Sequence, residues 1–271
     1  MLKQRVITAV ILLAIVFAVI LWLPPGGFHA FVALCIAIGA WEWSRLAGLQ
    51  GVPARAAYTL VMLVLMYALL QAPPASSSLL LRAGAFWWLF ALVFICLYPR
   101  ITALWHRTAR LLPLGFIVLL PGWIALVFLR SLEQYVFQIL LLLLIVAAAD
   151  IGAYFSGRAF GKHKLAPLVS PNKTVEGFIG GQVAACAVLW LALATPLLEL
   201  TFAESIIATL ATLVLASASV VGDLFESMLK RQAGVKDSGT LLPGHGGVLD
   251  RIDSLTAALP IYSILLQAGI L

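Results

Sequence analysis

Long apolar runs alternate with short polar connections along the whole chain. A helix that crosses a bilayer needs about 20 mostly apolar residues, because its backbone polar groups must be paired inside the hydrocarbon. Proline and glycine separate several of the runs, as at 24–27 and 73–74. The pattern predicts an all-α, polytopic integral membrane protein with about nine transmembrane helices, at 7–23, 28–46, 56–72, 79–98, 111–129, 135–155, 175–195, 203–225 and 254–270.

The composition agrees with this prediction and limits the number of domains. Apolar residues make up 63% of the 271 positions, whereas soluble proteins contain roughly 45–50%. We interpret residues 1–271 as a single membrane domain, because no connection is long enough to form a soluble domain. Residues 1–130 would be an N-terminal part with five helices. Residues 131–271 would be the catalytic part, with cytoplasmic loops at 156–174 and 228–252.

Two further features change little in this picture. The first apolar run follows Lys3 and Arg5, as in a secretory signal, but it ends in Pro-Pro-Gly-Gly without a cleavage pattern, so we expect a retained span. The three cysteines lie far apart in apolar runs. Their spacing predicts neither a disulfide framework nor a zinc site.

The distribution of basic residues predicts the orientation. Cytoplasmic loops of membrane proteins are enriched in Lys and Arg. With the N-terminus in the cytoplasm, fifteen of the 17 basic residues lie inside and only Arg82 and Arg130 lie outside. The C-terminus would then be outside. This bias accounts for most of the net charge of +6, so no nucleic-acid partner is predicted.

Segment 222–253 is unusually rich in charge for this chain. Asp223 and Glu226 are three residues apart, as are Asp250 and Asp253, so each pair would project from one face of a helix. Two acidic faces could meet around a divalent cation, and hard oxygen ligands favour magnesium or manganese over zinc. The alternative is a salt-bridge network with Lys230 and Arg251. His245 lies among glycines, and either a structural or a ligand-binding role is open.

A second polar region begins at the cytoplasmic end of the sixth run. Asp150 lies there, and an ionisable residue at that depth is a functional candidate, although it could instead pair with Arg158 or Lys162. The small and basic residues that follow suit phosphate binding, without forming a Walker loop. Glu42 and Arg45, at the end of the second run, are interpreted as a local helix pair.

The two polar regions resemble the marked regions of phosphatidate cytidylyltransferases, also called CDP-diacylglycerol synthases. The first resemblance rests on Ser227, Leu229, Lys230, Arg231, Lys236, Asp237, Gly239, Leu242, Pro243, His245, Gly246, Gly247, Asp250, Arg251 and Asp253. The second rests on Asp150, Tyr154, Gly157, Arg158, Gly161, Ser170, Pro171, Lys173, Thr174, Glu176 and Gly177.

The resemblance implies a reaction and a set of site residues. CTP and phosphatidic acid would give CDP-diacylglycerol and pyrophosphate at the cytoplasmic side of a bacterial-type inner membrane. Asp223 and Asp250 would hold Mg²⁺, supported by Glu226 and Asp253, with a second cation left open. The phosphates would be bound by Lys173, Lys230, Arg231, Lys236 and Arg251. Further substrate-binding positions would be Asp150, Tyr154, Arg158, Ser170, Glu176, Asp237, His245, Gly246 and Gly247, with Asp150 and Glu176 orienting the cations.

Two other classes of function use similar parts. A CTP-dependent kinase of a polyprenol-like alcohol would release CDP rather than pyrophosphate, and a transporter would move a substrate without converting it. Small residues at Gly177, Gly180 and Gly181 could pack helices within one subunit or across a homodimer, and we favour packing within one subunit.

Overall fold

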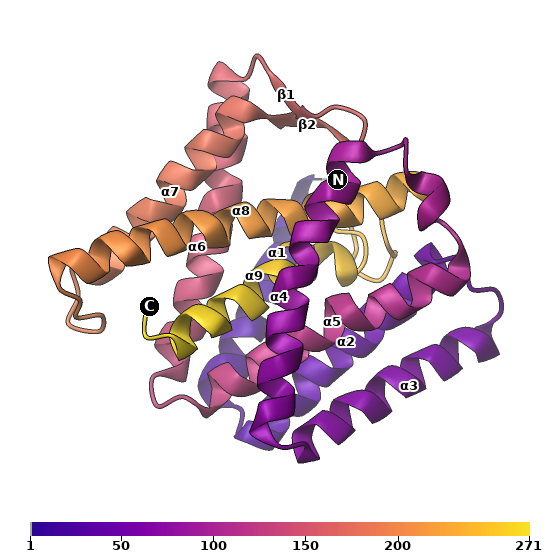
Figure 1. The fold of residues 1–271 in the computed structure, drawn as a ribbon, viewed down its shortest axis with the longest axis horizontal. Coiled ribbons are helices and arrows are strands. Elements are labelled where there is room, and N and C mark those ends of the chain that lie inside the picture. Colours follow the sequence, from indigo (N-terminus) through magenta and orange to yellow (C-terminus); the bar gives the residue numbers. More distant parts are fainter. Residues whose placement is uncertain (1) are drawn as a thin grey trace.

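The computed structural model describes residues 2–271, without the side chains of Leu2, Lys3 and Arg5. Nine α-helices form the described part of the chain, joined by short connections (Figure 1). They are α1 (Leu2–Trp22), α2 (Pro25–Leu46), α3 (Val52–Gln71), α4 (Pro74–Leu97), α5 (Thr108–Ser131), α6 (Tyr135–Phe160), α7 (Val175–Leu193), α8 (Phe202–Gln232) and α9 (Leu249–Gln267). A 3-10 turn, η1 (Thr102–Leu104), precedes α5.

The helices confirm the predicted all-α membrane fold in its general form. Seven of them, α2 to α8, are long and apolar enough to cross a bilayer. The apolar part of α1 is shorter, Val6–Trp22, and α9 begins with charged residues. Each predicted stretch coincides with a helix, while the count of nine spans and the positions of the two termini stay predictions.

One small element was not expected from the apolar pattern. Strands β1 (Lys164–Ala166) and β2 (Ser170–Thr174) form an antiparallel hairpin between α6 and α7. Figure 1 shows this hairpin at one end of the α6 and α7 pair, and Arg231 near the end of α8 donates a hydrogen bond to the Val169 carbonyl oxygen in the hairpin turn. It occupies most of the loop predicted at 156–174, whose first residues belong to α6.

The last helices differ most from the predicted boundaries. Helix α8 continues seven residues beyond the predicted end at 225, to Gln232, and α9 begins at Leu249. The connection is therefore 233–248 rather than 228–252. The apolar run in the sequence stops where the charged residues begin. Helix α8 nevertheless continues, because Glu226 and Lys230 are buried in the protein. Gly234, with φ of +70°, then adopts the left-handed conformation that commonly ends a helix.

Helices α6 and α7 pack closely through small residues. A Cβ atom on Gly152 would lie 2.6 Å from the Ala184 methyl carbon and 2.8 Å from the Gly180 carbonyl oxygen. A Cβ atom on Gly181 would lie 2.6 Å from the carbonyl oxygen of Ala149. These glycines serve packing within the subunit, as favoured from the sequence.

Substituting Gly181 by Ala is expected to lower the free energy of unfolding by about 1–3 kcal/mol, because the backbones of α6 and α7 must separate. Thermal unfolding in detergent measures the effect. Gly26→Ala is the control, since a Cβ atom on Gly26 meets no atom within 4 Å. Equal melting temperatures for the two variants would contradict the close packing.

Candidate active site

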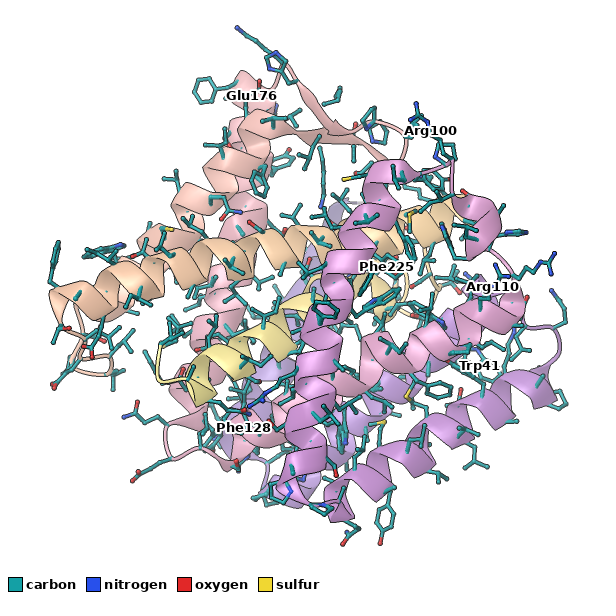
Figure 2. The ribbon with its side chains drawn as sticks, in the orientation of Figure 1. Trp41, Arg100, Arg110, Phe128, Glu176 and Phe225 are labelled. Atoms are coloured by element: carbon teal, nitrogen blue, oxygen red, sulfur yellow. The ribbon has the colours of Figure 1, made fainter. Side chains whose placement is uncertain are left out.

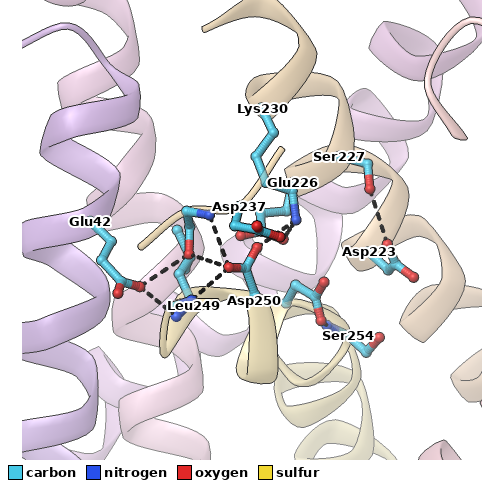
Figure 3. Close-up of polar contacts among 12 residues, drawn as sticks. Glu42, Asp223, Glu226, Ser227, Lys230, Asp237, Leu249, Asp250 and Ser254 are labelled. Atoms are coloured by element: carbon cyan, nitrogen blue, oxygen red, sulfur yellow. Dashed lines mark hydrogen bonds and ion pairs between the residues drawn. The ribbon is translucent and has the colours of Figure 1, made fainter. Parts of the chain in front are cut away.

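A buried lysine joins the two acidic helices. The Lys230 ammonium donates to Glu226 Oε2, one turn earlier on α8, and to Asp250 Oδ1 in the first turn of α9, at 2.6 Å each (Figure 3). All three residues are buried. As the spacing of three residues predicted, acidic side chains lie on the facing surfaces of α8 and α9. A lysine, however, lies between Glu226 and Asp250.

Asp250 also organises the connection between α8 and α9. Its second oxygen, Oδ2, accepts hydrogen bonds from the Ser238 backbone N–H and hydroxyl, both at 2.9 Å, and from the Gly247 N–H at 2.8 Å. Burial alone would raise the pKa of Asp250, but the bonds from Lys230, Gly247 and Ser238 together hold it below its ordinary value. Asp250 therefore stays ionised and holds segment 238–247 against α9.

The hairpin brings a second lysine to the site. Lys173, on β2, forms an ion pair of 2.6 Å with Asp223 on α8. Asp223 also accepts a hydrogen bond from the Ser227 hydroxyl at 3.2 Å. Among the described residues Asp150 forms no ion pair with Arg158 or Lys162, the alternative pairing considered from the sequence.

Asp253 completes the acidic cluster. The backbones of α8 and α9 approach each other here, since a Cβ atom on Gly222 would lie 2.5 Å from the Asp253 carbonyl oxygen. The Asp253 carboxyl interacts with those of Asp223 and Glu226. Burial, and then the charge of Asp223, raise the pKa of Asp253. The carboxyl groups of Asp223, Glu226 and Asp253 therefore act on one another where α8 meets α9.

The donor set can be compared with what magnesium requires. Within residues 2–271, no three His, Cys, Asp or Glu side chains already stand in a metal-binding arrangement. Both Asp250 oxygens are engaged by the protein. Glu226 Oε1 is buried beside Asp253 and has no hydrogen-bond partner while both groups are ionised. Both Asp223 oxygens are also engaged, Oδ1 by the Ser227 hydroxyl and Oδ2 by Lys173. Glu226 and Asp253 thus fit a hard cation chemically, and Asp223 and Asp250 fit one only if their present bonds change.

Glu42 and Arg45 do not form the local pair expected from their spacing. The Glu42 carboxylate, buried at 5% exposure, accepts hydrogen bonds from the Val248 N–H at 3.2 Å and the Leu249 N–H at 2.7 Å. Arg45 instead donates to the Asp237 and Ser238 carbonyl oxygens, at 3.3 and 2.7 Å. The end of α2 therefore binds the α8–α9 connection. The only hint of this contact in the sequence was the presence of two charged residues, Glu42 and Arg45, at the end of an apolar run.

A sequence comparison decides the family. Residues 3–268 match the model described as the cytidylyltransferase family. The chain belongs to this family. The recognition made from the two polar regions is confirmed, as is the prediction of a nucleotidyltransferase enzyme.

Relatives of this cytidylyltransferase match it from end to end. A protein of Pseudomonas aeruginosa is 46% identical over 99% of this chain and 98% of its own length. A protein of Haemophilus influenzae is 39% identical over 97% of this chain and 98% of its own length. A protein of Bacillus subtilis is 37% identical over 97% of this chain and 97% of its own length. All three are named phosphatidate cytidylyltransferase.

Other predicted residues of this cytidylyltransferase lie around the cluster or apart from it. Arg231 donates to the Val169 carbonyl oxygen at 3.3 Å, and Lys236 is exposed. His245 Nδ1 is buried without a hydrogen-bond partner, and its role in binding a ligand stays a prediction. Asp237 is exposed in the connection, Gly246 and Gly247 adjoin Asp250, and Ser170 begins β2.

Three predicted positions belong to the hairpin end of α6 and α7. The Glu176 carboxylate accepts bonds from the backbone N–H groups of Lys162 and His163 and contacts the His163 ring at 2.6 Å. Figure 2 shows Glu176 beside the hairpin, away from the middle of the molecule. Glu176 therefore holds the segment that leads into the hairpin, and its role in orienting phosphate-binding cations stays a prediction. Arg158 contacts the Tyr154 hydroxyl at 3.4 Å, and both are exposed.

Proposed function

We propose that this protein transfers the cytidylyl group of CTP to phosphatidic acid and releases pyrophosphate, at the cytoplasmic face of a bacterial inner membrane. The observation that carries the proposal is the 46% identity, over nearly both whole chains, to a protein named phosphatidate cytidylyltransferase. The cytoplasmic location is supported by the inside excess of Lys and Arg. CTP is a cytosolic solute and the lipid phosphate lies at the interface, so both could reach the same site.

The reaction needs no protein nucleophile. An oxygen of the lipid phosphate attacks the α-phosphorus of CTP, and the bond from that phosphorus to the pyrophosphate oxygen breaks. A phosphate monoester has a second pKa of about 6, so the lipid is largely dianionic at neutral pH. The chain's task is to bring two anions together and to stabilise the leaving pyrophosphate.

Basic side chains at the edge of the cluster suit this task. Arg231, Lys236 and Arg251 are exposed and would bind phosphate oxygens. Lys173 is 24% exposed and pairs with Asp223, so it would bind phosphate only by leaving that carboxylate. Lys230 differs from them, because it is buried and already contacts two carboxylates. We assign Lys230 to holding α8 and α9 together rather than to binding substrate.

The acidic cluster would hold magnesium through Asp223, Glu226 and Asp253. When bound, the ion would neutralise phosphate charge. The five carboxylates Asp150, Asp223, Glu226, Asp250 and Asp253 outnumber the basic side chains that act on them, Lys173, Lys230 and Arg251. Asp250 would shape the connection above the site through its bonds to Ser238 and Gly247.

Identifying both products tests the proposed reaction. Purified protein, incubated with labelled CTP, phosphatidic acid and magnesium, is expected to form CDP-diacylglycerol and pyrophosphate in equal amounts. Omission of phosphatidic acid should stop release of pyrophosphate. Formation of CDP and a phosphorylated alcohol from a polyprenol would instead identify a kinase and exclude the proposal.

A further inference from the structure

We propose that Glu42 is a positioning residue for this reaction: it sets the orientation of Asp250 through Ser238 and the first turn of α9. The inference rests on the proposed function. Glu42 belongs to α2, in the N-terminal part of the chain, and it lies outside both regions that carry the family resemblance. Figure 3 shows its side chain reaching from α2 to the connection that precedes α9.

A chain of hydrogen bonds links the two carboxylates. The Ser238 hydroxyl lies 3.1 Å from Glu42 Oε2 and 2.9 Å from Asp250 Oδ2. It has one proton to donate, so the two carboxylates share it. The position of Ser238, and with it one side of Asp250, therefore depends on Glu42.

Glu42 also caps α9, whose first turn contains Asp250. The N-cap residue of α9 is Val248, whose side chain cannot accept a hydrogen bond. Glu42, on α2, provides the acceptor instead, because its carboxylate accepts hydrogen bonds from the Val248 and Leu249 N–H groups. A carboxylate at a helix N-terminus is also stabilised by the helix dipole. Asp250 is the next residue, so displacement of this turn would move its carboxylate.

The connection approaches Glu42 closely at Gly239 and Gly247. A Cβ atom on Gly239 or on Gly247 would collide with the Glu42 carboxylate. Beside this contact lies a cavity of about 480 Å³, lined by residues of α2, α3 and the connection, including Trp41, Thr59 and Thr240. Because this cavity lies beside the segment, residues 237–239 are held by the bonds that Glu42 and Arg45 make, together with those between Ser238 and Asp250.

A double-mutant cycle of Glu42→Gln and Ser238→Ala tests the proposal. Each single variant is expected to lower kcat by about 10- to 100-fold, because a hydrogen bond to a charged group is lost. The KM for CTP and for phosphatidic acid should change by less than about threefold, since neither residue contacts substrate. The double variant should be no slower than the slower single variant, because both residues act through one chain of bonds.

Two controls separate positioning from a general loss of structure. Ser44→Ala also removes a buried hydroxyl, but one on α2 that donates to the Trp41 carbonyl oxygen and has no hydrogen bond to Asp250. It should leave kcat unchanged. Ser238→Ala keeps the backbone bond from Ser238 to Asp250, so it should fold even if Glu42→Gln does not.

The outcomes distinguish this inference from the proposed function. If the wild-type protein makes no CDP-diacylglycerol, the proposed function fails. If the wild-type protein is active and Ser238→Ala keeps its kcat within about twofold, the positioning role is excluded. The same conclusion follows if the effects on kcat multiply in the double variant, or if kcat falls only in proportion to folded protein.

Discussion

Replacing Lys230 by Met is expected to lower the free energy of unfolding by about 3–5 kcal/mol and to abolish turnover. Methionine fills a similar volume but removes the charge between Glu226 and Asp250. Both carboxylates would then be buried without their cation, since their side chains are only 4% and 5% exposed. A buried charge without a partner is among the largest single destabilising effects known in proteins.

Thermal unfolding in detergent and the yield of folded protein measure this effect. Lys164→Met is the matched control, because Lys164 is exposed on β1 and lies apart from the ion pairs. Combining Lys230→Met with Glu226→Gln should restore part of the lost stability by removing one unpaired charge. A melting temperature for Lys230→Met equal to that of Lys164→Met would show that the buried lysine does not hold α8 to α9.

Replacing Asp223 by Asn should lower turnover by about 10³-fold while the protein remains folded. Asp223 makes one ion pair with Lys173 and accepts one hydrogen bond from Ser227, and its side chain is more exposed than those of Glu226 and Asp250. Its side chain is 29% exposed, so loss of the ion pair should cost about 1 kcal/mol or less. The effect on activity would then reflect the reaction and not stability.

Initial rates of CDP-diacylglycerol formation, measured over a range of magnesium concentrations, check this prediction. Glu133→Gln is the control, as it neutralises a carboxylate in the exposed connection between α5 and α6. Near-normal turnover of Asp223→Asn would remove Asp223 from the proposed metal site. Asp250→Asn is a less direct test, because it also removes a charged acceptor of Lys230 and the Ser238 hydroxyl.

Much of the fold could be predicted because each helix corresponds to a continuous apolar run in the sequence. Runs of apolar residues must be long enough to span hydrocarbon, so all nine predicted stretches coincide with helices. The predictions were weakest at helix ends. Helix α8 extends into charged sequence, because the ion pair of Lys230 with Asp250 on α9 stabilises a turn that hydropathy assigns to a loop. Helix α6 also continues past the predicted end at 155, to Phe160.

The sequence predicted which residues belong to the candidate site, but not which of them form ion pairs and hydrogen bonds with one another. The polar residues at 223–253 were singled out by their charge and by their resemblance to one family. Their spacing predicted acidic faces on α8 and α9, but it could not indicate that Lys230 lies between Glu226 and Asp250. It also suggested a pairing of Glu42 with Arg45 that the structure does not contain.

The sequence by itself determined the membrane class, the positions of the helices and the enzyme family, because these depend on local periodicity and on residue types at set spacings. Only the tertiary structure decided that Glu42 binds Ser238, 196 positions away, and that Lys173 reaches Asp223 from a hairpin. The physical reason is that partners for buried charges are chosen by how helices pack. That packing depends on contacts between segments far apart in the chain, which no local pattern records.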